Sequence, residues 1–100
     1  MKKSTIIARL EKLAQEKQVN KTSCAYTYIK EWLEIGNQNG MIRTCHTSGR
    51  GRFCSNLDYT RAVENLCDAL KLKIESGNDA PRGGLTGNFV KIITKVDFNN

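Results

Sequence analysis

The chain has 100 residues with no long linker or low-complexity stretch, which favours a single domain over residues 1–100 with a modest core. No apolar run is long enough to span a membrane, and charged residues interrupt the apolar stretch near the start, so we expect neither a membrane segment nor a signal peptide. A cytoplasmic location follows as an expectation, with the four cysteines reduced. The formal net charge is +6, and residues 41–57 hold three arginines and no acid. This charge serves solubility, and it also favours an acidic partner such as nucleic acid.

Two amphipathic helices are expected in the first forty residues. Ser4 is placed to cap a helix that runs to about Lys17, and Thr22 or Ser23 to cap a second helix that ends at Gly36. The residues that three- and four-residue spacing directs inward are Ile6, Leu10, Leu13 and Ala14 in the first helix and Ala25, Ile29, Trp32 and Leu33 in the second.

The connection between these helices carries a further pattern, made of Leu13-Ala14, Val19 and Lys21-Thr22-Ser23. It resembles the small-residue, turn and polar-start pattern of helix-turn-helix DNA-binding proteins. The resemblance implies that the second helix presents its first exposed residues to a major groove, namely Lys21, Ser23, Tyr26 and Thr27. Gln18 stands where that family has a turn glycine, and Lys17 and Thr27 fall where it has core apolar residues. The interpretation that we favour is therefore an ordinary two-helix hairpin, with the DNA-binding unit as the alternative.

Alternation over Met41–Leu57 predicts a β-hairpin with a tight turn at Gly49-Arg50, which would pair Ile42 with Leu57. One face of this hairpin is apolar, and the other displays Arg43 and Arg52. His46 falls beside Phe53 on the apolar face, which favours a structural histidine over a catalytic one.

The stretch Asp58–Leu70 is the helix around which we expect the chain to fold. Asp58 is a suitable N-cap, because its carboxylate can accept hydrogen bonds from the free backbone N–H groups of the first turn. The inward stripe predicted for this helix consists of Ala62, Val63, Leu66, Cys67 and Leu70.

Two more strands are expected after that helix, over Lys71–Ser76 and Phe89–Val96. The glycine-rich stretch Gly77–Asn88 between them fits neither a helix nor a strand. The sequence therefore predicts an α+β domain of order α-α-β-β-α-β-β, with a mostly antiparallel four-stranded sheet whose free edge offers a route to a homodimer.

No pattern of enzymes or metalloproteins is present. Cys45, His46, Cys54 and Cys67 lack the CxxC or HxxxH spacing of a structural zinc site. The single histidine and the absence of a nucleophile elbow argue against nucleophilic catalysis. We therefore expect a protein that is not an enzyme and has no metal and no cofactor.

Two glycine- and arginine-bearing stretches remain as candidate sites. Ser48–Arg52 joins a flexible backbone to guanidinium forks that bind phosphate in bidentate fashion, and the loop after Gly77 can form an anion-binding nest. The alternative for both is a soluble turn. The candidate residues for nucleic-acid or anion binding are Lys21, Arg43, Arg50, Arg52, Arg82, Gly83 and Gly84.

The segment Gly77–Asn88, GNDAPRGGLTGN, resembles C-terminal tails of small phage and prophage proteins. The resemblance implies an accessory or anti-defence role for a mobile genetic element, in a class that includes inhibitors of CRISPR–Cas systems, with a host cytoplasmic location. The first hypothesis is a binding protein whose basic face engages nucleic acid or a host nucleoprotein complex. The alternatives are a protein–protein inhibitor or dimeric structural module, and a nucleotide-sequestering protein.

Overall fold

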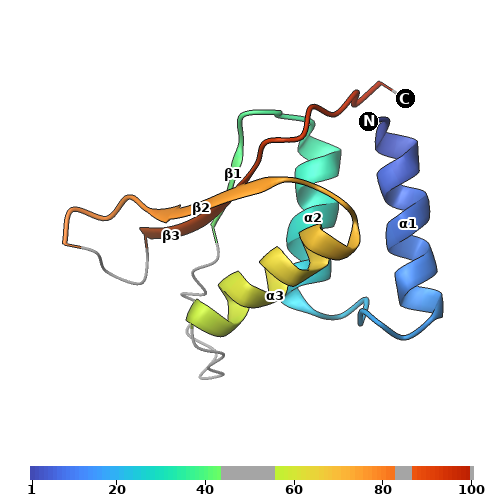
Figure 1. Cartoon of the computed structure of the whole chain (residues 1–100), viewed down its shortest axis with the longest axis horizontal. Coiled ribbons are helices and arrows are strands. Elements are labelled where there is room, and N and C mark those ends of the chain that lie inside the picture. The colour runs from blue at the N-terminus through green and yellow to red at the C-terminus, as the bar shows by residue number, and fades with distance from the viewer. Residues whose placement is uncertain (44–55, 83–86, 100) are drawn as a thin grey trace.

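The computed structural model of the chain describes residues 1–43, 56–82 and 87–99 (Figure 1). Its elements in chain order are α1 (Lys3–Gln15), α2 (Cys24–Ile35), β1 (Met41–Arg43), α3 (Asn56–Ala69), β2 (Ile74–Asn78) and β3 (Asn88–Ile92). The three strands form one sheet in the order β1-β3-β2, and both pairings are antiparallel. The predicted α+β class is confirmed. Four strands were predicted, and the described part of the chain has three.

The first helix differs at both ends from the prediction. α1 begins after Lys2, which makes no side-chain cap, so Ser4 is not the N-cap. It ends at Gln15, because Lys17 adopts a left-handed backbone conformation with φ 60° that cannot continue a helix. Its predicted inward residues Ile6 and Leu10 are fully buried.

The second helix begins and ends as predicted. The Ser23 hydroxyl accepts a hydrogen bond from the Tyr26 backbone N–H at 3.3 Å, and Gly36 ends the helix with φ 70°, a value that glycine adopts without steric cost. Ala25, Ile29, Trp32 and Leu33 are buried as expected. Tyr26, expected to be exposed at the start of a recognition helix, is only 8% exposed, so that prediction is wrong.

The predicted first hairpin is wrong in its pairing. β1 pairs with β3, so that Ile42 lies opposite Val90, whereas its predicted partner Leu57 lies in α3. The helix begins at Asn56, two residues before the predicted cap at Asp58. The predicted turn at Gly49-Arg50 lies outside the described residues, as do Cys45, His46, Phe53 and Cys54.

The predicted second hairpin is present with shifted ends. β2 starts three residues later than expected, because Lys71 takes a left-handed conformation with φ 60° and Leu72 is buried before the strand begins. β3 ends at Ile92 rather than Val96, although the Ile93 backbone N–H still donates to the Lys73 carbonyl at 2.8 Å.

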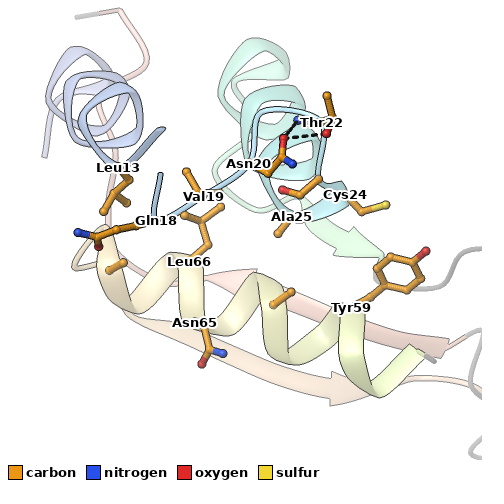
Figure 2. A pocket seen from close by; sticks show the side chains of 13 residues that line it. Leu13, Gln18, Val19, Asn20, Thr22, Cys24, Ala25, Tyr59, Asn65 and Leu66 are labelled. Atoms are coloured by element: carbon orange, nitrogen blue, oxygen red, sulfur yellow. Dashed lines mark hydrogen bonds between the residues drawn. The ribbon is translucent and has the colours of Figure 1, made fainter. Parts of the chain in front are cut away.

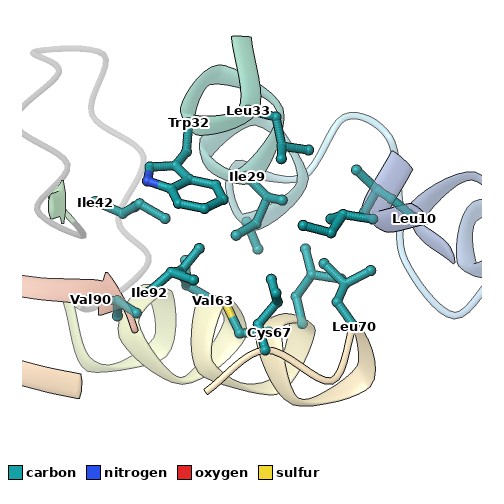
Figure 3. Packing of buried hydrophobic residues seen from close by; sticks show 14 of the residues in the cluster. Leu10, Ile29, Trp32, Leu33, Ile42, Val63, Cys67, Leu70, Val90 and Ile92 are labelled. Atoms are coloured by element: carbon teal, nitrogen blue, oxygen red, sulfur yellow. The ribbon is translucent and has the colours of Figure 1, made fainter. Parts of the chain in front are cut away.

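The core lies between the inner face of the sheet and the helices (Figure 3). Ile42, Val90 and Ile92 point toward α2 and α3, where they meet Trp32, Val63 and Cys67. The remaining predicted stripe residues of α3, Leu66 and Leu70, are also buried. Ala62, which was predicted to face the core, is exposed, because the stripe on α3 is narrower than the spacing suggested.

Backbone contacts fasten the two ends of the chain to each other. Lys2 and Asp97 form a parallel bridge, in which Lys3 donates to the Asp97 carbonyl at 3.0 Å and Asp97 donates to the Met1 carbonyl at 2.8 Å. The Arg9 guanidinium also donates to the Leu70 carbonyl at 3.1 Å, at the end of α3. α1 is therefore held to both the C-terminal segment and α3.

Candidate nucleic-acid interface

Both glycine- and arginine-bearing segments leave the sheet at the same end. In the strand register Arg43 is opposite Phe89 and Asn78 is opposite Asn88, so the last residues of β1 and β2 flank the first residues of β3. We call this the loop end of the sheet. The stretch with Arg50 and Arg52 begins directly after β1, and the stretch with Arg82 begins directly after β2.

An ion pair joins the two strands at the loop end. Arg43 donates from Nη1 to Asp79 Oδ1 at 2.6 Å and from Nη2 to Oδ2 at 2.7 Å, the two-point geometry that matches a guanidinium to a carboxylate. The hydrogen bond and charge of Arg43 lower the pKa of Asp79, and the hydrogen bond to Asp79 raises the pKa of Arg43. Arg43 was predicted to lie in a field without acids. That expectation overlooked Asp79, which is distant in sequence.

Short polar contacts hold the base of the β2–β3 connection closed. Asp79 donates from its backbone to the Gly87 carbonyl at 3.1 Å, and the Asn78 side chain accepts from the Ala80 backbone at 2.9 Å. Gly87 is buried against this turn, and a Cβ at that position would lie 2.5 Å from the Ala80 nitrogen. The glycine is therefore needed for close backbone approach, and the connection leaves the sheet as a narrow neck.

The predicted site residues other than Lys21 divide into three groups. Arg82 is exposed in a turn after Pro81, close in sequence to Asp79 and therefore to the loop end. Arg43 lies at the loop end and is ion-paired. Arg50, Arg52, Gly83 and Gly84 lie outside the described residues.

Lys21 belongs to a different part of the molecule. It lies in the connection between α1 and α2, on the side of the molecule away from the loop end (Figure 1). Its Nζ is 3.1 Å from Glu11 Oε2, and the Tyr26 hydroxyl donates to Glu11 Oε1 at 3.0 Å. These bonds lower the pKa of Glu11, and desolvation together with the Glu11 contact raises the pKa of Tyr26. The three side chains tie α1 to the start of α2, so a structural role accounts for Lys21.

A groove of about 680 Å³ lies between the end of α1, the connection that follows it and α3 (Figure 2). Leu13 and Val19 stand at one end and Tyr59 at the other, and Ala62 and Ala69 are exposed on α3 along it. The lining residues are apolar or uncharged. Sequence periodicity did not indicate this groove, since it assigned Ala62 to the core.

The two cysteines described by the structure lie in different surroundings. Cys67 is fully buried, and desolvation together with the charge of Glu64 raises the pKa of its thiol from 9.0 to about 12. Cys24 is half-buried at the start of α2. Within residues 1–43, 56–82 and 87–99, no group of three or more His, Cys, Asp or Glu side chains is arranged to hold a metal ion.

No helix in the described part of the chain is long and apolar enough to cross a membrane. No protein-family model, curated protein or solved structure matches this chain. Its function must therefore be inferred from its own side chains, charge and geometry.

Proposed function

We propose that this protein is a non-enzymatic binding protein that engages nucleic acid at the loop end of the sheet. The observation that supports this most is that the two glycine- and arginine-bearing segments begin at the same end of the sheet, after β1 and β2, the strands on either side of β3, next to the Arg43–Asp79 pair. Residues 41–55 and 79–88 together contain four arginines and one acid, a net charge of 4 − 1 = +3. Positive charge concentrated in two segments that begin at one end of a sheet is the electrostatic pattern expected of a phosphate-binding surface.

The arginines at this end have different roles in the proposal. Arg50, Arg52 and Arg82 are the phosphate ligands, because guanidinium groups bind phosphate oxygens through two parallel hydrogen bonds. Arg43 is a positioning residue, because Asp79 already occupies both of its outward nitrogens. The likeness of Gly77–Asn88 to C-terminal tails of small phage and prophage proteins suggests the setting, in which the target is host nucleic acid or a host nucleoprotein complex.

The test is nucleic-acid binding by fluorescence anisotropy over a series of salt concentrations. Each phosphate contact to duplex DNA contributes about 0.9 to the slope of log affinity against log salt, so Arg50→Ala/Arg52→Ala should weaken binding and reduce that slope by about 2. Lys12→Ala/Lys30→Ala removes the same charge from α1 and α2 and is the matched control. Equal affinity and slope in both double variants would contradict the proposal.

A protein–protein inhibitor is the second candidate, and the groove beside α3 favours it. Its uncharged lining and the small side chains of Ala62 and Ala69 suit the close approach of an apolar helix face from another protein. A partner that Ala69→Glu releases in nuclease-treated lysate, while Arg50→Ala/Arg52→Ala retains it, would favour this function over nucleic-acid binding.

A further inference from the structure

The sheet has an inner face in the core and an outer face that none of the three helices packs against. Cross-strand partners share a face, and Ile42, Val90 and Ile92 point into the core. The alternate positions therefore face outward, and they are Met41, Arg43, Glu75, Gly77, Phe89 and Lys91.

Phe89 is the aromatic residue of this outer face. It is partly exposed, and it is not among the partly buried apolar side chains that pack against the described core. Its ring lies over Gly77 of the neighbouring strand, where an added Cβ would be 2.8 Å from Phe89 Cζ. A side chain at position 77 would push the ring away from the sheet. The glycine thus allows the ring to lie against the strand next to it.

The surroundings of Phe89 combine positive charge with exposed apolar surface. Arg43 is its cross-strand partner on β1, and Lys91 follows it by two positions on the same face. Met41 and Ile93, at alternate positions along the same face, are 44% and 51% exposed. The charged residues on and beside this face also include Lys73, two positions before Glu75, and the loop-end residues Arg82 and Asp79. The set has four cations and two acids, a net charge of 4 − 2 = +2, namely Arg43, Lys73, Arg82, Lys91, Glu75 and Asp79.

An aromatic ring among cations on the outer face of a sheet is suited to unpaired bases. Every base has a π-face that stacks on an aromatic side chain, while the basic residues contact the backbone phosphates. In a duplex the bases already stack on one another, so their π-faces cannot reach a ring on a sheet.

We propose that the outer face selects single-stranded nucleic acid, with a base stacked on Phe89 and phosphates contacted by Lys91 and Arg82. This inference rests on the proposed nucleic-acid binding and names the form of nucleic acid that is bound. Loss of one stacked base weakens single-strand affinity by about 5- to 160-fold.

The experiment compares a fluorescein-labelled single-stranded 15-mer with the duplex of the same sequence, using the full chain. Phe89→Leu should lose about 5- to 160-fold in affinity for the single strand and change duplex affinity by less than twofold, and Phe89→Trp should restore binding. Phe98→Leu is the control for loss of an aromatic ring, because Phe98 packs edge-on against Trp32 with ring centroids 5.1 Å apart, away from the outer face. Gly77→Ala keeps the ring but displaces it, and should also weaken single-strand binding.

A measurement on the wild-type chain complements the variants. If a base stacks on Phe89, its ring-proton resonances should shift upfield on titration with the single-stranded 15-mer and stay in place with the duplex. Unchanged single-strand affinity in a folded Phe89→Leu variant, or unshifted ring protons, would overturn this inference and leave nucleic-acid binding intact. If the wild type binds neither oligonucleotide, the proposed function fails and this inference with it.

Discussion

Arg43 and Asp79, 36 positions apart in the chain, meet in a two-point ion pair with distances of 2.6 and 2.7 Å. The pair couples the end of β1 to the residue that follows β2, and Arg43 Nη1 also approaches the Gly87 carbonyl at 3.5 Å. One guanidinium therefore contacts both sides of the neck from which the Arg82 segment extends. A phosphate at this position must share Arg43 with Asp79 or displace it, so Asp79 should restrain nucleic-acid affinity.

Asp79→Asn should therefore raise nucleic-acid affinity at low salt. The substitution removes a negative charge beside the arginines and frees the guanidinium of Arg43 to bind phosphate. We expect affinity to rise about 2- to 5-fold, the change that corresponds to the free energy of an exposed ion pair. Fluorescence anisotropy measures the change, and Glu34→Gln, which removes an equal charge from the exposed face of α2, is the control. A decrease in affinity that is specific to Asp79→Asn would show that Asp79 organises the site more than it repels phosphate.

The pKa of Asp79 provides a direct test of the ion pair. The hydrogen bond and charge of Arg43 lower this pKa from its usual value of 3.8, so the pair's contribution to stability is complete above pH 3.8 and is lost as the pH falls through the lowered pKa. Carboxyl ¹³C chemical shifts followed during an acid titration should place the wild-type pKa below 3.8 and return it to about 3.8 in Arg43→Gln. The same pKa in both proteins would mean that the pair does not form in solution.

Gly87→Ala should lower the free energy of unfolding, because the added methyl group would clash with the base of the β2–β3 connection. A methyl group at this position would lie 2.5 Å from the backbone nitrogen of Ala80 and 2.6 Å from the Cβ of Ala80. Neither atom is at the end of a flexible side chain, so neither can move away easily. Overpacking of this kind costs about 1–3 kcal/mol in the free energy of unfolding. Urea denaturation measures it, and Ser76→Ala on exposed β2 should stay within about 0.5 kcal/mol. Equal stability of the two variants would mean that the neck adjusts freely.

Local patterns in the sequence predicted the helices and the second hairpin. The contacts between residues that are distant in sequence were not predicted. Ser23 and Gly36 act through the residues next to them, so capping chemistry located α2. The partner of β1 was not predictable in this way, because alternation shows that Ile42 faces inward but does not say whether Leu57 or Val90 lies opposite it.

The candidate site shows the same limit. Glycine and arginine identified the two segments in the sequence, but the fact that β1 and β2 both end beside the start of β3 follows from the strand order, with β3 between them. The neutralisation of Arg43 by Asp79 and the position of Phe89 over Gly77 also depend on that strand order. Nucleic-acid binding by these segments, which the sequence suggested, stays a prediction.

The two cysteines in the described residues should differ sharply in reactivity. Only the thiolate attacks an alkylating reagent, and burial together with Glu64 raises the pKa of Cys67 to about 12, so about one thiol in 10⁴ is ionised at pH 8. Cys24 is half-buried at the start of α2, so we expect the reagent to reach it without unfolding of the protein. Under native conditions at pH 8, iodoacetamide should modify Cys24 well before Cys67, as measured by peptide mapping at successive times. In urea the two should react at similar rates, which controls for local sequence effects. Native labelling of Cys67 as fast as that of Cys24 would mean that α3 does not pack on the core as described.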